Sequence, residues 1–369
     1  MILYCPFFNS FVKNKQTMKK LIVLGLIAIG FTSCNETKST VKRDGAPIDL
    51  TALEGNGEKI LSKYMNTITN AELKEMLYVY AGDEMEGRDT GEPGQKRAVE
   101  YLRKQYVDMG VASGVNDKSY FQIVPDTYFR KGSGIKSSEN VLAFIKGSEK
   151  PEEVLVLSAH LYHKGMDKDG NVYNGADDDG SGTVSILEIA DAFQQAVKDG
   201  NGPKRSILFL HVTGEEKGLY GSKYYTQNPI YPLKNTIANL NIDMIGRVDE
   251  IHTEDPNYVY LIGSDKLSTD LHNISASIGS KFSDINLDYR YNAKNEPNRF
   301  YYRSDHYNFA KNNVPVIFYF NGTHEDYHKI TDTPDKINYP MLEKRTRLIF
   351  ATAWELANRK DRPVVDKAE

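Results

Sequence analysis

Two stretches of the sequence decide the fold: EVLVLSAHL at residues 153–161 and YNGADDDGSGT at residues 173–183. The first is a continuous apolar run of strand length that ends in His160, as is typical of a strand buried on both faces. The second places three consecutive aspartates between glycines, directly before an apolar helical pattern over residues 181–197. These aspartates form either a solvated acidic turn or a set of oxygen ligands for a cation, and the neighbouring segments decide between the two.

Apolar runs of strand length alternate with amphipathic helical segments along the rest of the chain. The strand-like runs are residues 140–147, 153–161, 206–214, 237–246, 258–264 and 314–322. The helical patterns are residues 71–80, 94–110, 181–197, 218–227, 268–279 and 339–359, with Asn70 as the expected N-cap of the first and Gly110 as the stop of the second. This alternation predicts one α/β domain over residues 49–369, with a central, mostly parallel mixed sheet flanked by helices on both faces.

Polar side chains follow the ends of these predicted strands. In open α/β sheets the loops at the carboxyl ends of the strands carry the functional site, so these side chains are expected to converge. Each one alone is more often a cap or a surface residue, but their recurrence at successive strand ends favours a common site. Their carboxylate and imidazole groups suit zinc, with manganese or cobalt as substitutes. They are His160, Asp177, Glu215, Glu216, Asp243, His324 and His328.

A set of motifs in the same order resembles the co-catalytic di-zinc aminopeptidase family. That family is typified by bacterial leucyl aminopeptidase and includes relatives of glutamate carboxypeptidase and glutaminyl cyclase. The resemblance covers roughly residues 70–358, and the opening segment AGDEMEGRDTGEPGQKRAVEYL also looks like that of the family. The motifs are SAHLYHKG, NGADDDGSG, TGEEKGLYGS, NIDMIG, YRSDHYNF and DYHKITDTPDKI.

The resemblance implies two zinc ions that share one carboxylate. It makes Asp177 the bridging ligand, His160 and Asp243 the other ligands of one ion, and Glu216 and His328 those of the second. A shared anion is physically reasonable, because two cations about 3.5–4 Å apart repel each other strongly without one.

The resemblance also implies the catalytic residues. Glu215 is the expected general base for a water molecule that attacks a peptide carbonyl. Tyr301, three residues before Ser304, is the expected hydrogen-bond donor to the developing oxyanion, although Tyr302 is an equal candidate. Asp305 resembles a family position of uncertain role, and a carboxylate at a helix N-terminus explains it equally well.

One position departs from the family pattern. The family usually has an aspartate two residues after the first metal histidine, where this chain has Tyr162. Losing a carboxylate that orients a ligand typically costs about 10–100-fold in metal affinity or activity, so we expect the His160 zinc position to be the weaker one. Asp167 and Asp169 in the following loop are candidates to compensate.

The sequence therefore predicts a zinc-dependent exopeptidase, most simply an aminopeptidase that acts on peptides. The short interval before residues 140–147 predicts that the protease-associated insertion of some relatives is absent. Two alternatives stay open: a glutaminyl cyclase with a single zinc ion, and a non-catalytic binding lipoprotein on the same fold. Metal stoichiometry separates the first alternative from a two-zinc peptidase, and retention of Glu215 argues against the second.

The first 33 residues read as a targeting segment. MKKLIVLGLIAIGFTSC begins at Met18, a candidate for the true start, with two lysines followed by an eleven-residue apolar stretch. It ends in FTSC, which resembles a lipobox with Cys34 as the lipidated residue, and residues 34–48 then form a polar tether. We expect a protein of the bacterial cell envelope, held at the membrane by this lipid alone.

Cysteine content and charge exclude other classes. Cys5 and Cys34 are the only two cysteines, so the predicted mature chain has neither an internal disulfide nor a thiolate metal site. That chain has 42 basic and 50 acidic residues, a net charge near −8, because four of the 46 lysines and arginines and none of the acids precede Cys34. This balance argues against a nucleic-acid partner, and the oligomeric state stays open.

Overall fold

A computed structural model describes residues 48–116 and 119–367, all of which belong to one compact unit. The predicted signal segment, Cys34 and the tether up to residue 47 lie outside the described residues. Among the residues that are described, no helix combines the length and the apolar character needed to cross a membrane.

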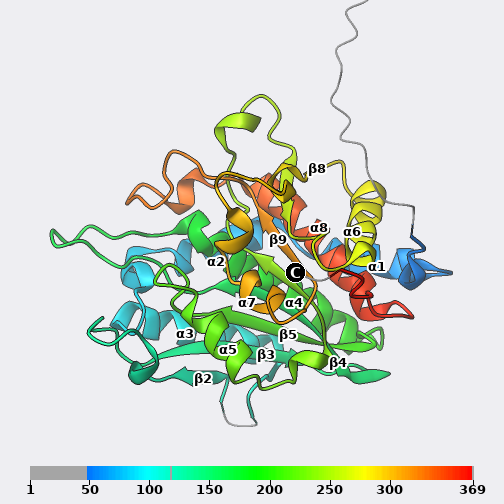
Figure 1. Cartoon of the computed structure of the whole chain (residues 1–369), viewed down its shortest axis with the longest axis horizontal. Helices are drawn as coiled ribbons and strands as arrows, with labels where there is room; N and C mark the ends of the chain where they lie inside the picture. Colours follow the sequence, from blue (N-terminus) through cyan, green and yellow to red (C-terminus); the bar gives the residue numbers. More distant parts are fainter. Residues whose placement is uncertain (1–47, 117–118, 368–369) are drawn as a thin grey trace, which may run out of the picture. The chain divides into compact units, whose positions relative to one another are not determined.

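The centre of the unit is a mixed β-sheet with the strand order β1-β3-β5-β4-β6-β9-β7-β8, and β2 pairs with β3 (Figure 1). The four central strands β5, β4, β6 and β9 are parallel, whereas β3 and β7 flank them in the antiparallel direction. The predicted mixed sheet is thus confirmed. The strands are Ala112–Ser113 (β1), Phe121–Val124 (β2), Ser138–Ile145 (β3), Lys150–His160 (β4), Arg205–Val212 (β5), Thr236–Ile242 (β6), Tyr258–Ile262 (β7), Asn286–Asp288 (β8) and Val316–Phe320 (β9).

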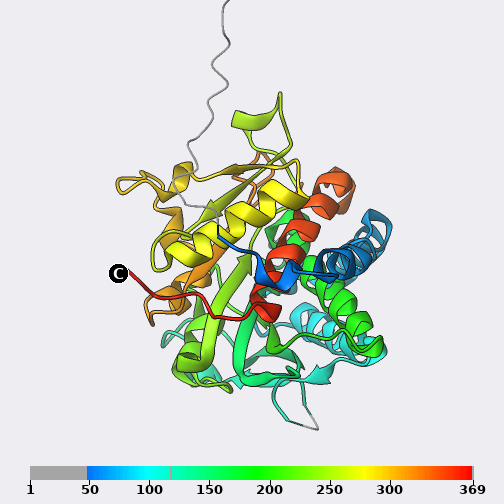
Figure 2. The same ribbon diagram turned by 90° about the vertical axis from the view of Figure 1, so that its right-hand side faces the viewer.

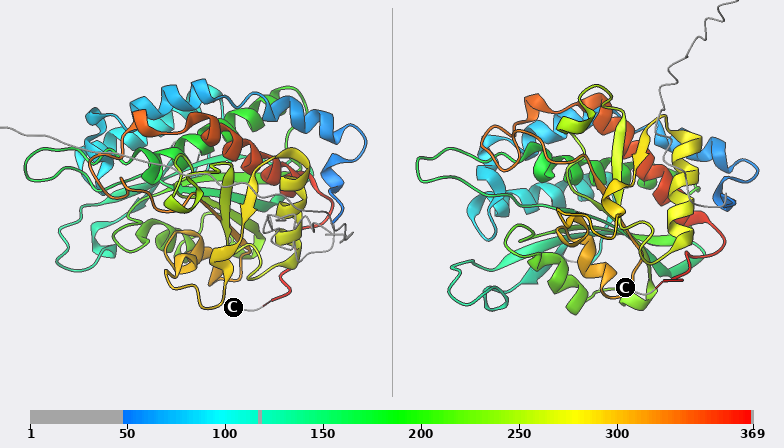
Figure 3. Two further views of the ribbon diagram at one scale, coloured as in Figure 1. Left: turned by 90° about the horizontal axis from the view of Figure 1, so that it is seen from above. Right: turned by 45° about the horizontal axis from the view of Figure 1, so that its top comes forward.

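Helices cover both faces of the sheet, as Figure 3 shows. One face packs against α1–α4, α6 and α8, and the other against α5 and α7. Helix α8 lies between α6 and α1, where Figure 2 shows it in red. The helices are Gly57–Met65 (α1), Asn70–Tyr80 (α2), Pro93–Met109 (α3), Gly182–Lys198 (α4), Tyr220–Gln227 (α5), Thr269–Phe282 (α6), His306–Ala310 (α7) and Tyr339–Asn358 (α8).

The apolar run in β4 explains why this strand lies at the centre. Leu155 and Leu157 face the core under α4 and α8, whereas Val154 and Val156 face the second core under α5 and α7. All four side chains are buried, so the strand contributes to both cores with its alternate residues. Its carboxyl end therefore has a fixed position in the middle of the molecule.

The helix boundaries agree with the sequence patterns, with one correction. Gly110 follows α3 in the left-handed conformation at φ 79°, as expected for a helix stop. The predicted N-cap Asn70 is wrong, because Thr69 precedes α2 and its hydroxyl accepts a hydrogen bond from the backbone N–H of Glu72 at 3.3 Å. Asn70 is instead the first residue of the helix. The sequence patterns did not identify α1, α7 or the short strands β1, β2 and β8.

Candidate metal centre

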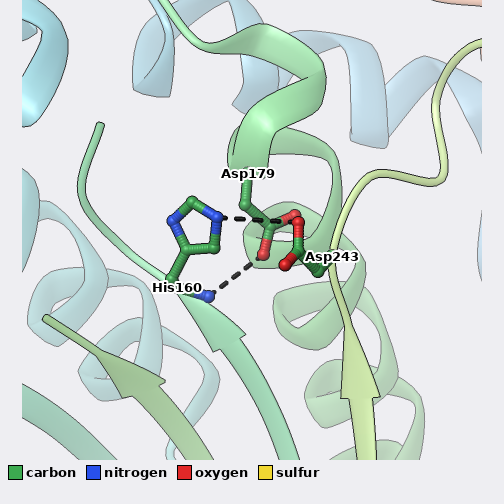
Figure 4. Close-up of side chains that lie close together, drawn as sticks. All are labelled: His160, Asp179 and Asp243. Atoms are coloured by element: carbon green, nitrogen blue, oxygen red, sulfur yellow. Dashed lines mark hydrogen bonds and ion pairs between the residues drawn. The ribbon is translucent and has the colours of Figure 1, made fainter. Parts of the chain in front are cut away.

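Three parallel strands deliver polar side chains to one edge of the sheet. His160 is the last residue of β4, Asp243 follows β6 directly, and Glu215 and Glu216 follow β5 by a short turn. Because β4 pairs with both β5 and β6, the carboxyl ends of these strands are adjacent. The predicted convergence of these residues is therefore found, and Figure 4 shows His160 and Asp243 facing each other, with Nε2 and Oδ1 3.6 Å apart.

The aspartate run occupies the turn before α4, and its middle residue faces the site. Oδ1 of Asp178 lies 3.0 Å from Nε2 of His160, and Oδ2 lies 3.1 Å from Nε2 of His328. Asp177 points elsewhere: its Oδ1 accepts a hydrogen bond from the backbone N–H of Gly246 at 2.6 Å, and Oδ2 lies 3.2 Å from Nε2 of His324. The structure thus contradicts the expected placement of Asp177, because the carboxylate that lies between the two imidazoles is that of Asp178.

The other acidic groups around the turn hold its backbone in place. The carboxylate of Asp179 accepts hydrogen bonds from the backbone N–H groups of His160, Gly182 and Met244 at 3.0–3.2 Å. Figure 4 shows the bond from His160. Asp332 accepts hydrogen bonds at 3.1 Å from the backbone N–H groups of the first two aspartates of the run. One ligand atom each of His160, Asp179 and Asp243 lies within 4.8 Å of the others. The Asp179 oxygens already accept these three hydrogen bonds, whereas the Asp178 carboxylate lies between two imidazoles, so Asp178 is the better candidate ligand.

A second group of ligand atoms lies on the other side of Asp178. Oε2 of Glu216 lies 2.8 Å from Nε2 of His328, as expected for two ligands of one ion. Oε1 of Glu216 lies 2.8 Å from Nδ1 of His163, a residue that the sequence patterns did not single out as a ligand. One ligand atom each of His163, Asp178 and Glu216 lies within 4.8 Å of the others, which is close enough for a shared cation position.

The atoms at this position are suited to a cation. Oδ2 of Asp178, Oε1 of Glu216 and both ring nitrogens of His163 are buried, yet none of them makes a hydrogen bond of acceptable geometry with the described residues. Buried polar atoms without partners are costly, and a metal ion would satisfy several of them together. A donor set of carboxylates and imidazoles without thiolates fits zinc.

The orientation of His160 does not depend on the side chain of Tyr162. Nδ1 of His160 lies 2.9 Å from the backbone carbonyl oxygen of Tyr162, which fixes the ring with Nε2 toward Asp178. The Tyr162 hydroxyl is buried and makes no hydrogen bond with the described residues. Asp167 does not compensate either, because its carboxylate accepts hydrogen bonds from Asp169 and Asn171 within its own exposed loop. The backbone carbonyl of Tyr162, and not a side chain, therefore orients His160.

Electrostatics separates the two consecutive glutamates. Burial raises the pKa of Glu215 well above its usual range, and the nearby imidazole of His160 opposes that shift only in part. Burial and Asp178 also raise the pKa of Glu216, but the opposite effect of His163 and His328 is larger. The pKa of Glu216 is therefore lowered from 4.5 to about 2. Glu216 is thus a permanent anion suited to hold a cation, whereas Glu215 is able to take up a proton.

A cavity of 290 Å³ opens beside these residues. Its lining combines the acidic groups of the site with an apolar wall and also includes Tyr327 and His328. The rings of Tyr327 and His328 are stacked with their centroids 3.8 Å apart. The remaining lining residues are Asp178, Glu215, Glu216, Gly218, Leu219, Asp243, Met244, Phe300, Arg303, Phe318 and Phe320.

Three other predicted residues lie outside this lining. Tyr301 belongs to the aromatic core under α5 and α7, where its ring packs beside that of His306 at 5.6 Å. Asp305 is buried and accepts a hydrogen bond from the hydroxyl of Ser222, and burial raises its pKa to about 7. His324 pairs with Asp177, as described above. The tyrosine that lines the cavity is Tyr327, which directly precedes a predicted ligand.

Comparisons with known proteins find relatives that are named as zinc peptidases. Among curated relatives, a "Probable zinc metalloprotease" of Pyricularia oryzae is 28% identical over 262 residues, 59% of this chain and 50% of the relative. A "Probable leucine aminopeptidase" of Arthroderma otae is 26% identical over 269 residues, 64% of this chain and 71% of the relative. The chain spans only 22 to 50% of the length of the first curated relatives that it matches.

Solved structures share the fold. The LapA aminopeptidase of Legionella pneumophila superposes with a TM-score of 0.63 at 22% identity, over 82% of this chain and 76% of that one. The zinc aminopeptidase BSAP of Bacillus subtilis superposes with a TM-score of 0.59 at 14% identity, over 82% of this chain and 98% of that one. A glutaminyl cyclase of Bacteroides thetaiotaomicron reaches 0.57 at 15% identity, over 80% and 99% of the two chains.

The family assignment rests on the match to a family model. The model described as "Peptidase family M28" matches residues 140–353, which is more than half of the chain and spans β3 to α8. The matched region includes both groups of ligand atoms, Glu215 and Tyr327. The resemblance inferred from the sequence motifs is confirmed, and this chain belongs to peptidase family M28.

Proposed function

We propose that this protein is a zinc-dependent aminopeptidase that removes N-terminal residues from peptides. One observation carries the proposal: two groups of ligand atoms share the carboxylate of Asp178, in a cavity that Glu215 also lines. The names of the curated relatives, zinc metalloprotease and leucine aminopeptidase, support the same chemistry.

The proposed ligands are His160, Asp178 and Asp243 for one zinc ion, and Asp178, Glu216 and His328 for the other. When bound, two zinc ions acidify a water molecule and polarise the scissile carbonyl group. The paired donor groups favour two ions, which supports the peptidase over a glutaminyl cyclase with a single zinc.

Glu215 and Tyr327 are the proposed catalytic side chains. Glu215 accepts a proton from the attacking water and donates it to the leaving amine, a role that its raised pKa suits. Tyr327 lines the same cavity, and its hydroxyl is a suitable donor to the oxygen of the attacked carbonyl. A binding protein without catalysis has no need of a buried glutamate beside the donor groups, so Glu215 supports an enzyme.

The lining and volume of the cavity also indicate which N-terminal residues the enzyme prefers. Its apolar wall is formed by Met244, Phe300, Phe318 and Phe320, and its volume of 290 Å³ is sufficient for one large side chain. We therefore expect a preference for apolar residues at the N-terminus of the peptide.

The test is a panel of aminoacyl reporters combined with metal analysis. We expect two zinc ions per chain, faster turnover of leucyl and phenylalanyl than of glutamyl reporters, loss of activity with a strong chelator, and recovery with zinc. Chelator-resistant activity would contradict the mechanism. Cyclisation of N-terminal glutamine with one zinc per chain would establish the cyclase instead.

We further propose that the protein is attached to the bacterial cell envelope through lipidated Cys34. The charged start at Met18, the apolar stretch after it and the FTSC segment support this proposal. Mass spectrometry of the membrane fraction should find an acylated cysteine as the N-terminal residue. A mature form that starts at another residue and remains in the soluble fraction would contradict it.

A further inference from the structure

His163 lies in the loop between β4 and the aspartate turn, and its side chain is completely buried beside Glu216. Its Nδ1 atom is 2.8 Å from Oε1 of Glu216 and 3.9 Å from Oδ2 of Asp178. The centroid of its ring is 6.0 Å from that of His328. His163 is thus a neighbour of every proposed ligand of the second zinc ion.

The backbone is shaped to admit this ring. Gly175, just before the aspartate run, has a φ of +53°, and a Cβ atom at that position would lie 2.5 Å from the His163 ring. Any side chain at residue 175 would therefore displace the imidazole from Glu216. The fixed position of the ring follows from this close approach and from its complete burial.

The geometry argues against a simple hydrogen bond between His163 and Glu216. Although Nδ1 and Oε1 are 2.8 Å apart, neither atom has a hydrogen-bond partner of acceptable geometry among the described residues. Nδ1 of His163 also lies 3.9 Å from Oδ2 of Asp178, and one ligand atom from each of the three residues lies within 4.8 Å of the others, close enough to hold one cation between them. Ligand atoms about 2.0–2.1 Å from one zinc ion are separated from each other by roughly 3.3 Å, which is close to the spacing seen here.

We propose that His163 is a further zinc ligand, through Nδ1, at the position of Glu216 and His328. This inference rests on the proposed two-zinc function. It gives the second position four protein ligands, namely His163, Asp178, Glu216 and His328, against three at the first, namely His160, Asp178 and Asp243. The position with four ligands is then the tighter one, and the first zinc ion to bind occupies it.

A zinc titration against a chromogenic chelator tests this assignment without reference to activity. His163→Asn keeps the approximate shape of the side chain, but its amide is a poor zinc ligand. We expect the dissociation constant of the tighter zinc ion to increase by at least about tenfold. Loss of a residue that only orients a ligand already costs about 10–100-fold, and loss of a ligand should cost no less. His160→Asn should weaken the other constant, and His272→Ala, on α6, should change neither.

X-ray absorption on protein loaded with one equivalent of zinc counts the imidazole ligands directly. The wild type should show two imidazoles per zinc, from His163 and His328, and His163→Asn should show one. One imidazole in the wild type, or unchanged zinc constants in the variant, would overturn the assignment. Thermal melting of the metal-free proteins shows whether His163→Asn folds, and His163→Gln is the second variant if it does not.

Failure of this inference is distinguishable from failure of the proposed function. If the wild type binds two zinc ions and hydrolyses aminoacyl reporters while His163→Asn binds zinc normally, only the role of His163 is wrong. If the wild type binds no zinc, both are wrong.

Discussion

The carboxylate of Asp178 lies between two imidazoles, with Oδ1 3.0 Å from Nε2 of His160 and Oδ2 3.1 Å from Nε2 of His328. His160 ends the central strand β4, whereas His328 comes from the loop after β9. One carboxylate thus connects ligands that are far apart in the sequence. Asp332, from that same loop, accepts a hydrogen bond from the backbone N–H of Asp178 and fixes the turn from which it projects.

The first prediction separates Asp178 from its neighbour. Asp178→Asn should reduce the zinc content from two ions per chain to less than one, because an amide cannot supply two anionic oxygens to two cations. Asp177→Asn is the matched control and should retain both ions, since Asp177 contacts Gly246 and His324 instead. Metal analysis after gel filtration measures both variants. Zinc loss in Asp177→Asn with full retention in Asp178→Asn would reverse the assignment.

The second prediction concerns the general base. Glu215→Gln should retain zinc and fold but lose turnover by about 10²–10⁴-fold, the contribution of a positioned general base. Steady-state kinetics on a leucyl reporter, with the zinc content measured on the same sample, gives the answer. Turnover within a factor of a few of the wild type would exclude Glu215 from proton transfer.

The third prediction distinguishes two tyrosines. Tyr327→Phe should lower kcat by about 10²–10³-fold if the hydroxyl donates to the developing oxyanion. Tyr301→Phe should leave kcat nearly unchanged, because Tyr301 lies in the aromatic core and does not line the cavity. The opposite pattern would restore the role that the sequence predicted for Tyr301.

The fourth prediction reverses an expectation from the sequence. From the sequence alone, Tyr162→Asp restores the aspartate that the family usually has and should tighten the His160 zinc position. The backbone carbonyl of Tyr162 already accepts from His160, so the substitution adds no necessary contact. The substitution would instead bury a new negative charge near Glu216, Glu215 and Asp178. These carboxylates lie close to residue 162, since burial first and then their charges raise the pKa of Tyr162.

We therefore expect Tyr162→Asp to lower the melting temperature of the metal-free protein and to leave the His160 zinc constant unimproved. Tyr162→Phe is the control, since it removes only a hydroxyl without a hydrogen-bond partner among the described residues. A tighter zinc constant in Tyr162→Asp, measured by chelator competition, would show that an aspartate side chain orients His160 better than the carbonyl does.

The fold was predictable because the apolar runs and helical patterns that specify it are local and periodic in the sequence. The apolar run of β4 predicts burial on both faces, and the alternation of strands and helices predicts the layers. The strand-end rule likewise brought together His160, Glu215 and Asp243, since His160 ends its strand, Asp243 follows its strand directly and Glu215 follows by a short turn. These residues depend little on the conformation of a long loop.

The errors fall where loop conformation decides. Asp177, Asp178 and Asp179 have the same side chain, and only the backbone dihedral angles of the turn determine which one faces His160. The sequence pointed to Tyr301 or Tyr302, whereas the tyrosine among the cavity-lining residues is Tyr327, because no periodic pattern indicates which loop tyrosine lines the cavity. His163 was overlooked since its position depends on the close approach of Gly175.

The last prediction tests a buried carboxylate away from the metal centre. Glu188 on α4 is only 8% exposed, and its carboxylate accepts a hydrogen bond from the backbone N–H of Thr69 at 3.3 Å. Burial, followed by the nearby charge of Glu72, raises its pKa from 4.5 to about 8. The other acidic neighbours, Asp191 and Glu343, act in the same direction.

Because the folded-state pKa is higher than the unfolded one, the folded protein holds the proton more tightly. The stability associated with this proton is present below pH 4.5 and is lost as the pH rises to about 8. Glu188→Gln keeps an acceptor for Thr69 but cannot ionise, so it should be more stable than the wild type at high pH. The expected gain grows to the order of a few kcal/mol between pH 5 and pH 9. Thermal unfolding of the metal-free proteins at several pH values measures this difference, and Glu152→Gln, at an exposed position of β4, is the control. Parallel stability curves for Glu188→Gln and the wild type would show that Glu188 ionises without cost in the folded protein.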